Sequence, residues 1–138
     1  MSSRDERDAL AQFSERYAAP SADVAAGIER RVIGAVWGAN GYTTLGQADE
    51  LGHRLNLRPG RRLLDVGTGR GWPGLHLART TGCAVVGTDM PIEGLAVAAR
   101  RARAEGIEDR AAFAAAAGAS QPFRAGWFDG VVLTDVLC

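Results

Sequence analysis

Two aspartates beside a run of glycines are the residues whose types and spacing could do chemistry. Asp65 opens the segment 65–71, DVGTGRG, which follows a short apolar run and precedes a helical pattern. Glycines at such a turn let the backbone bend sharply and approach a ligand that a Cβ would block. A carboxylate at the end of a strand needs a cation or hydrogen-bond donors in front of it, and it would repel a pyrophosphate. The segment therefore predicts a ligand site at the end of a strand.

The second aspartate, Asp89, comes 24 residues after Asp65, at the end of the next apolar run. A carboxylate there can accept hydrogen bonds from both hydroxyls of a ribose. Together the two acids favour a nucleoside ligand that carries positive charge and lacks phosphate. S-adenosylmethionine has this chemistry, because it combines a sulfonium, an ammonium and a ribose.

The elements that must position these acids alternate between strand and helix patterns. Apolar runs predict four strands, at residues 62–66, 84–88, 111–116 and 131–134. Helical stripes predict two helices between them, one from Pro73 to Gly82 and one from Ile92 to Gly106. This alternation is typical of an α/β fold with a parallel sheet and right-handed crossovers. Three arginines, Arg100, Arg101 and Arg103, lie off the apolar stripe of the second helix, which predicts a solvated face.

The first 57 residues carry helical patterns only. A first helix is predicted from residue 4 to the break at Pro20, and a third, short one follows residues 42–44. Between them, a second helix is predicted from residues 21–23 to residue 38, with one apolar face formed by Val24, Ile28, Val32, Ala35 and Val36. Residues 42–44 either fold over a ligand as a lid or only begin the third helix. We expect a helical, lid-like region at 1–57 and a cofactor-binding α/β core at 58–138.

With these elements the chain resembles the class I (Rossmann-like) S-adenosylmethionine-dependent methyltransferases. The resemblance rests on the glycine motif at 63–71, on Thr88-Asp89-Met90, and on the segment 121–132 that enters the fourth strand. It covers residues 40–138. It implies a Rossmann-like parallel sheet preceded by N-terminal helices. The activity it implies is methyl transfer from S-adenosylmethionine to a small-molecule acceptor, with S-adenosylhomocysteine as the product.

The resemblance also implies a role for individual residues. Asp65 would anchor the loop near the methionine ammonium, Asp89 would hold the ribose, and Met90 would pack on adenine. Asp135 is the candidate catalytic residue, and no metal site is expected. The family often has an aspartate where this chain has Ala117. The complete set of expected cofactor-binding residues is Asp65, Gly67, Thr68, Gly69, Gly71, Asp89, Met90, Ala117, Gly118 and Thr134.

Domains of this class continue through a fifth strand, a helix and an antiparallel hairpin, whereas this sequence ends at Cys138. We therefore expect a chain truncated after its fourth strand. Residues 131–137 would then form an exposed apolar edge, which is the kind of edge that pairs with another chain. A homodimer through this edge is one expectation. A domain that binds the cofactor or a partner without catalysis is the main alternative function.

A dinucleotide-binding oxidoreductase is a further alternative. Residues 69–74 match G-x-G-x-x-G, and Asp89 follows Gly69 by 20 residues, as in NAD-binding domains. The register argues against this alternative, because Gly69 lies three residues beyond Val66 rather than directly at the strand end. Pro73 also removes a backbone N–H that a pyrophosphate would use at the helix start.

Composition excludes several other classes. The 138 residues carry 16 basic and 16 acidic side chains, so the net charge is zero. This balance argues against a nucleic-acid partner and against a polybasic membrane surface. The two cysteines, Cys83 and Cys138, show no zinc or disulfide spacing, and the charged N-terminus is unlike a signal peptide. A cytoplasmic location is the simplest interpretation.

Overall fold

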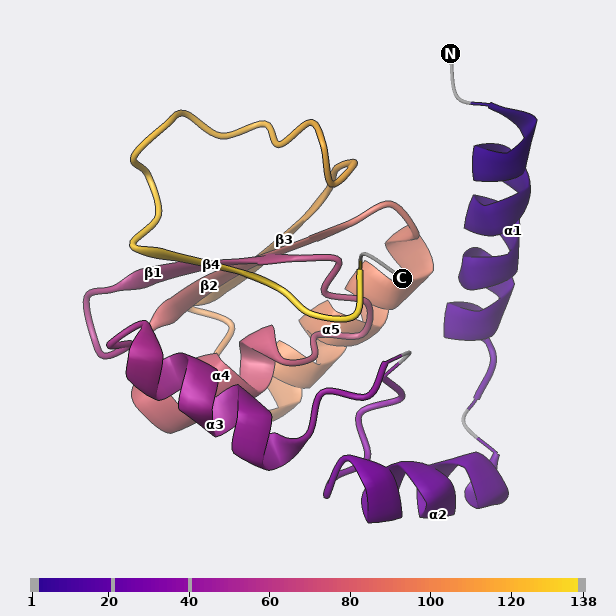
Figure 1. The fold of residues 1–138 in the computed structure, drawn as a ribbon, viewed down its shortest axis with the longest axis horizontal. Coiled ribbons are helices and arrows are strands. Elements are labelled where there is room, and N and C mark those ends of the chain that lie inside the picture. Colours follow the sequence, from indigo (N-terminus) through magenta and orange to yellow (C-terminus); the bar gives the residue numbers. More distant parts are fainter. Residues whose placement is uncertain (1–2, 21, 40, 137–138) are drawn as a thin grey trace.

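The computed structural model describes residues 3–20, 22–39 and 41–136, and a four-stranded sheet forms its centre (Figure 1). The strands are β1 (Arg62–Val66), β2 (Ala84–Asp89), β3 (Ala111–Ala115) and β4 (Gly130–Leu133). Their order is β3-β2-β1-β4, and every neighbouring pair is parallel. The predicted α/β class and all four predicted strands are confirmed, with bounds that differ by at most one residue.

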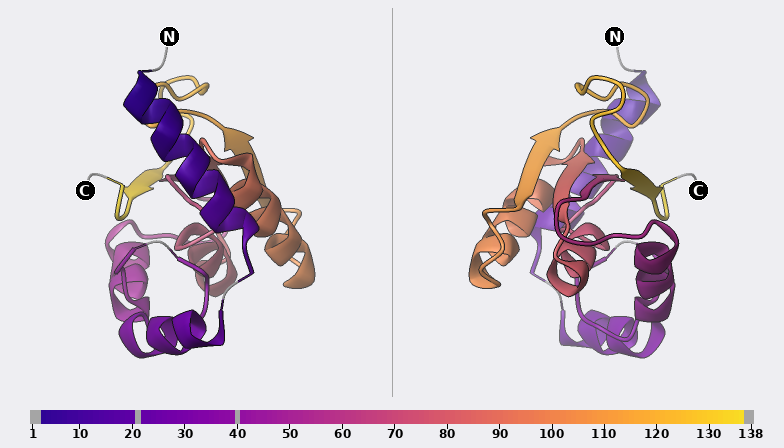
Figure 2. Two further views of the ribbon diagram at one scale, coloured as in Figure 1. Left: turned by 90° about the vertical axis from the view of Figure 1, so that its right-hand side faces the viewer. Right: turned by 90° about the vertical axis from the view of Figure 1, so that its left-hand side faces the viewer.

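Five helices accompany the sheet in the described residues. They are α1 (Arg4–Ala18), α2 (Asp23–Val32), α3 (Leu45–Arg54), α4 (Gly74–Thr81) and α5 (Ile92–Ala104). Helix α4 packs on β1 and β2, α5 packs on β2 and β3, and α3 packs on α4. These three helices lie on one face of the sheet, and the connection from β3 to β4 passes over the other face (Figures 1 and 2).

The central strand explains why the site forms where it does. Residues 63–66 are all buried, as expected of a parallel strand with neighbours on both sides. The register pairs Val66 with Thr88 of β2 and with Leu133 of β4, so these three strands end level with one another. The residues that follow each strand therefore emerge side by side at one edge of the sheet.

Helix α1 stands at this carboxyl edge and packs on α5 (Figures 1 and 2). Its last carbonyls have no partner within the helix, as at any helix end. The buried guanidinium of Arg70, in the glycine loop, lies with Nη2 at 2.7–2.8 Å from the carbonyl oxygens of Arg16, Tyr17 and Ala19. A positive charge is favourable at a helix C-terminus. Arg70 therefore ties α1 to the glycine loop.

The second helix is shorter than predicted. It ends at Val32, so Ala35 and Val36 lie outside it, because Gly34 takes a left-handed conformation with φ +92°. The Glu29 carboxylate then accepts hydrogen bonds from the N–H groups of residues 37–39 at 2.8–2.9 Å, which holds that segment in a tight turn. The predicted apolar face of the helix is not buried, and none of the α2 side chains is. The predicted start at residue 21 lies outside the described residues.

The expectation of a solvated arginine face on α5 is wrong for Arg101. Its guanidinium turns inward and donates to the carbonyl oxygens of Trp37 and Arg70. It also lies over the Trp37 ring, 5.3 Å from the ring centroid. Arg100 and Arg103 are exposed, as predicted. Arg101 thus connects α5 to both the glycine loop and the turn after α2.

Strand β4 forms one edge of the sheet. Val131 and Leu133 are 49% and 48% exposed, whereas Val132 between them is buried. The predicted apolar edge is therefore present over residues 131–136, and residues 137–138 lie outside the described part. Pairing of two chains through this edge stays a prediction. Within the described residues, no helix has the length and apolar character that a membrane span requires.

Replacing Arg70 with methionine tests the tie between α1 and the glycine loop. The variant keeps most of the aliphatic stem and removes hydrogen bonds that a charged donor makes to buried carbonyls. These are worth on the order of 2 kcal/mol. We expect α1 to open roughly 5- to 30-fold more often, which limited trypsin digestion would report as faster cleavage after the exposed Arg16. Arg79→Met is the matched control, since Arg79 is half-exposed and makes only a 3.7 Å ion pair with Glu105. Equal cleavage rates in the two variants would contradict the claim that Arg70 holds α1 against the glycine loop.

Candidate functional site

A cavity of about 670 Å³ lies between the carboxyl edge of the sheet and α1. Its volume is within the range of small-molecule and cofactor sites. Six parts of the chain line it: α1, residues 39 and 41, the glycine loop, the end of β2, the segment after β3, and the segment after β4. A cavity at the carboxyl ends of parallel strands is where open α/β sheets bind their ligands.

Most of the predicted cofactor-binding residues meet at this cavity. Those that line it are Gly67, Thr68, Gly69, Asp89, Met90, Ala117, Gly118 and Thr134. Asp135, the candidate catalytic residue, lines it as well. Asp65 and Gly71 do not line it. Residues from four separate segments are therefore brought together by the level ends of the strands.

Asp89 holds the glycine loop in place beneath the cavity. One carboxylate oxygen, Oδ2, accepts a hydrogen bond from the Gly69 N–H at 2.7 Å, and Oδ1 accepts one from the Met90 N–H at 2.8 Å. Burial raises the pKa of Asp89, and these two hydrogen bonds oppose that rise. Gly69 has φ +54°, and a Cβ there would lie 2.7 Å from the Tyr17 hydroxyl oxygen. Only glycine combines this backbone conformation with such a close approach.

Asp65 lies one layer behind the cavity and is completely buried. Its Oδ2 accepts hydrogen bonds from the Thr68 hydroxyl at 2.7 Å and from the Gly74 N–H at 2.9 Å. Oδ1 is buried without a hydrogen-bond partner among the described residues. Asp65 therefore anchors the loop, as expected, while a contact with the methionine ammonium stays a prediction. The first N–H of α4 is already engaged by this carboxylate, so the helix start is not arranged to bind a pyrophosphate.

Asp135 is tied to the segment after α2 rather than left open for proton transfer. Its Oδ2 accepts hydrogen bonds from the Thr43 N–H at 3.1 Å and from the Thr43 hydroxyl at 2.7 Å. Partial burial raises the pKa of Asp135, but the hydrogen bonds from Thr43 and from the Tyr42 N–H outweigh it and hold the pKa below its usual value. These hydrogen bonds give Asp135 a role in holding residues 42–43, and a catalytic role for Asp135 stays a prediction.

Residues 42–44 begin the third helix, which is one of the two roles that the sequence left open. Thr44 caps α3, because its hydroxyl accepts from the Gln47 N–H while the Gln47 side chain accepts from the Thr44 N–H. Thr43 instead reaches across to Asp135, and its carbonyl oxygen accepts from the Trp72 indole N–H at 3.1 Å. The segment thus begins a helix and contacts both Asp135 and Trp72, while a lid over the ligand stays a prediction.

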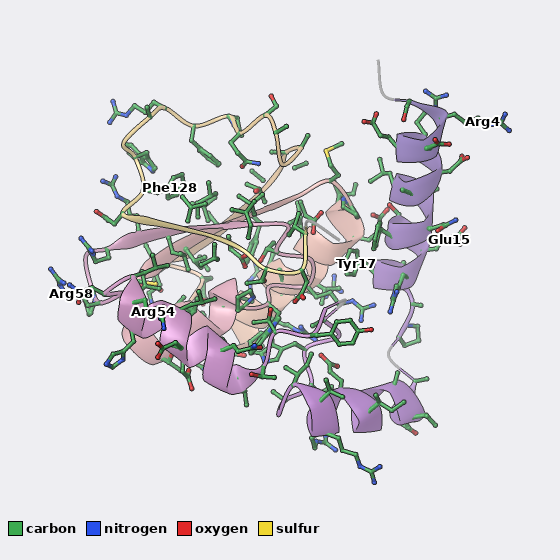
Figure 3. All side chains as sticks on the ribbon, viewed as in Figure 1. Arg4, Glu15, Tyr17, Arg54, Arg58 and Phe128 are labelled. Carbon is green, nitrogen blue, oxygen red and sulfur yellow. The ribbon has the colours of Figure 1, made fainter. Side chains whose placement is uncertain are left out.

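The sequence analysis expected a lid-like region at 1–57 but named no residue of α1 as part of the site. Five of its residues line the cavity: Glu6, Ala9, Leu10, Phe13 and Tyr17. Figure 3 shows Tyr17 on the side of α1 that faces the sheet, with Arg4 and Glu15 on the other side. Burial, together with the nearby Asp89 charge, raises the pKa of Tyr17 to about 12, so its hydroxyl stays protonated. The apolar stripe of α1 is visible in the sequence, but nothing local indicates which surface it covers.

The geometry agrees with the comparison to known proteins. A family model described as "Methyltransferase domain" matches residues 63–138, which is more than half of the chain. The chain belongs to the methyltransferase domain family. The class I, Rossmann-like fold is thereby confirmed, and S-adenosylmethionine is the cofactor of this class. The family match and the engaged Gly74 N–H both argue against the NAD-binding alternative.

Relatives of this methyltransferase domain extend well beyond it. Methyltransferase GfsG of Streptomyces halstedii is 40% identical over 83 residues, which cover 60% of this chain and 30% of GfsG. The solved structure of the 4+2 cyclase SpnF has a TM-score of 0.57 and 34% identity, covering 61% of this chain and 31% of SpnF. A geranyl diphosphate methyltransferase in complex with GPP and sinefungin has a TM-score of 0.59 and 29% identity, covering 64% and 33% of the two chains. The chain thus spans about a third of the length of these relatives.

The buried carboxyl of Asp65 predicts an unusual dependence of stability on pH. Burial raises its pKa to about 7, although hydrogen bonds from Thr68 and Gly74 oppose the rise, whereas an unfolded aspartate titrates at roughly 4. Between these pH values the unfolded chain has lost the proton and the folded chain has kept it. The free energy of unfolding should therefore fall, by on the order of a few kcal/mol, as the pH rises from about 4 to about 7.

Asp65→Asn should remove most of this fall, because the amide keeps a hydrogen-bond acceptor and does not titrate. Urea denaturation across the same pH range measures the effect. Asp109→Asn is the control, since the Asp109 side chain is exposed. Its free energy of unfolding should fall with pH as steeply as that of the parent chain. A small slope should remain in Asp65→Asn because the pKa of Asp89 is also raised. If the free energy of unfolding fell equally steeply with pH in Asp65→Asn and in Asp109→Asn, the titration of Asp65 would not be the cause of the fall.

Proposed function

We propose that this chain binds S-adenosylmethionine in the cavity at the carboxyl edge of the sheet and forms the cofactor-binding part of a methyltransferase. The observation that carries the proposal is the junction of Gly69 with Asp89. Position 69 has a backbone conformation and surroundings that only glycine fits. Its N–H donates a hydrogen bond to the Asp89 carboxylate, which itself lines the cavity. This junction supports a ligand that lies against the loop and presents hydroxyl groups to the acid.

The cavity fits the proposed cofactor in shape and charge. Its volume suits a nucleoside with an amino-acid tail. Its acidic residues are Glu6, Asp89 and Asp135, and its one basic residue, Arg70, is engaged with the carbonyls of α1. An acidic wall suits a ligand that carries a sulfonium and an ammonium.

The proposed contacts follow from position. Asp89 would accept the ribose hydroxyls with the lone pairs that its two backbone hydrogen bonds leave, and Met90 would pack on the adenine. Ala117 and Gly118 would lie along the adenine edge, and Thr134 would lie beside the methyl group. The remaining contacts would come from the loop residues Gly67, Thr68 and Gly69, with Gly71 and Asp65 supporting the loop from behind. On this proposal α1 is the outer wall that shields the cofactor from water.

Methyl transfer asks little acid–base chemistry of these residues. The cofactor supplies an already activated methyl group, so the chain has to hold the donor and an acceptor nucleophile in line. A general base matters only for an acceptor that must lose a proton. Asp135 would hold residues 42–43 through hydrogen bonds rather than act as that base.

A small-molecule acceptor is proposed from the relatives, which include a geranyl diphosphate methyltransferase. SpnF is named as a cyclase, so a likeness of this degree does not by itself establish methyl transfer. Binding without catalysis therefore stays the alternative for this chain. The division at residues 57 and 58, a homodimer through β4 and a cytoplasmic location also stay proposals.

Calorimetric titration with S-adenosylhomocysteine tests the proposed cofactor site. The parent chain should bind it saturably, and Asp89→Ala should weaken binding by roughly 1–3 kcal/mol, or about 5- to 150-fold, because charge-assisted hydrogen bonds are lost. Asp109→Ala is the matched control, and circular dichroism establishes that all three proteins are folded. A folded parent chain that ignores the ligand would overturn the proposal. Unchanged affinity in Asp89→Ala would overturn the ribose assignment alone.

A further inference from the structure

A second cavity, of about 430 Å³, lies next to the cofactor cavity. It is enclosed by the end of α1, by α2, and by residues 38–39 and 41–42. The two cavities share four lining residues, Tyr17, Ala39, Gly41 and Arg70. A molecule in the second cavity would therefore be separated from the proposed cofactor by a single layer of residues. None of the roles assigned so far uses this space.

We propose that the second cavity binds the methyl acceptor, and that this acceptor is an apolar small molecule. The proposal rests on the proposed function, because it takes the first cavity as the place of the methyl donor. It assigns α2 and residues 38–39 and 41–42, which lie outside the residues that match the family model, to substrate recognition.

Three charged side chains line this cavity: Glu29 and Arg70 bind backbone groups, and Arg16, at the end of α1, is exposed. Both carboxylate oxygens of Glu29 accept hydrogen bonds from the N–H groups of residues 37–39. The Arg70 guanidinium is directed at the carbonyls at the end of α1. The two Glu29 carboxylate oxygens and the Arg70 Nη2 group therefore have little capacity left to recognise a charged ligand. Most of the remaining wall is apolar, formed by residues such as Ala22, Ala25 and Ile33.

Exposed apolar side chains surround the opening. Ile28, Val32 and Tyr42 line the cavity and are 58%, 47% and 80% exposed. Apolar side chains gathered around a hollow are typical of a ligand site. Because this surface is concave and encloses a limited volume, a small molecule fits it better than the flat surface of a partner protein does. An apolar ligand there would also cover the face of α2 that the fold leaves unburied.

Gly41 lines both cavities and lies next to the proposed position of the methyl group of the cofactor. A Cβ at this position would overlap the carboxylate of Asp135, so the absence of a side chain lets the segment pass directly beside the end of β4. Thr134 and Asp135 line the cofactor cavity there. An acceptor atom that reaches past Gly41 would approach the methyl group from the second cavity. Asp135 acts here as a positioning residue, because its hydrogen bonds to Thr43 hold the segment in place.

The test uses the 138-residue chain with N-phenyl-1-naphthylamine, a neutral apolar probe whose fluorescence rises in apolar surroundings. The probe should bind saturably, both without and with saturating S-adenosylhomocysteine. Ala25→Phe fills the second cavity and should weaken probe binding by at least about tenfold, the effect expected of overpacking a site. Val24→Phe is the matched control, since Val24 is exposed on the same helix and lines neither cavity. It should change probe affinity less than about twofold.

Calorimetry with S-adenosylhomocysteine separates the two proposals. Unchanged affinity for this ligand in both variants would show that Ala25→Phe acts on the second cavity alone. Should Ala25→Phe fail to fold, Ile28→Gln against Val24→Gln gives the same comparison with a polar replacement. The inference is overturned if the probe does not saturate, if S-adenosylhomocysteine displaces it, or if the control variants weaken it equally. Failure of S-adenosylhomocysteine to bind the parent chain would instead overturn the proposed function.

Discussion

The buried carboxylate of Asp65 joins three elements at one point. Asp65 is the residue before the last of β1, and its carboxylate accepts hydrogen bonds from the Thr68 hydroxyl in the glycine loop and from the first N–H of α4, at Gly74. Placing a carboxyl group in the interior is costly, and hydrogen bonds offset the cost only in part. The loop and the helix start can therefore adopt few other arrangements without leaving a buried polar group unpaired. The shape of the cofactor cavity depends on this junction.

Several other charged side chains are likewise used to hold backbone rather than to face solvent. Arg70 binds the end of α1, Glu29 binds the turn after α2, and Arg101 binds the carbonyls of Trp37 and Arg70. Each satisfies carbonyl or N–H groups that irregular segments would otherwise leave unpaired. These hydrogen bonds place α1 and residues 37–39 and 41–43 around the carboxyl edge of the sheet. The contacts of Arg70 and Glu29 also explain how a neutral chain rich in arginine has a second cavity whose wall is largely apolar.

Much of the core could be predicted because its signals are local. Each strand is a short apolar run beside glycines, and the predicted bounds differ from those observed by at most one residue. The glycine spacing and the positions of Asp65 and Asp89 predicted a site at the strand ends, and the level register of β1, β2 and β4 brings that site together. The second helix was predicted too long, because its apolar spacing continues past Gly34 although the backbone there turns left-handed.

The sequence by itself determined the class of fold, the family and the position of the glycine loop and its two acids. Only the tertiary structure decided which surfaces enclose that loop. The contacts of Arg70 with Tyr17, of Asp135 with Thr43 and of Arg101 with Trp37 join residues 53, 92 and 64 positions apart. Hydrophobic periodicity shows that a helix has an apolar face, but it does not show what covers that face. The walls of both cavities are built from such distant pairs, so they form only when the chain is folded.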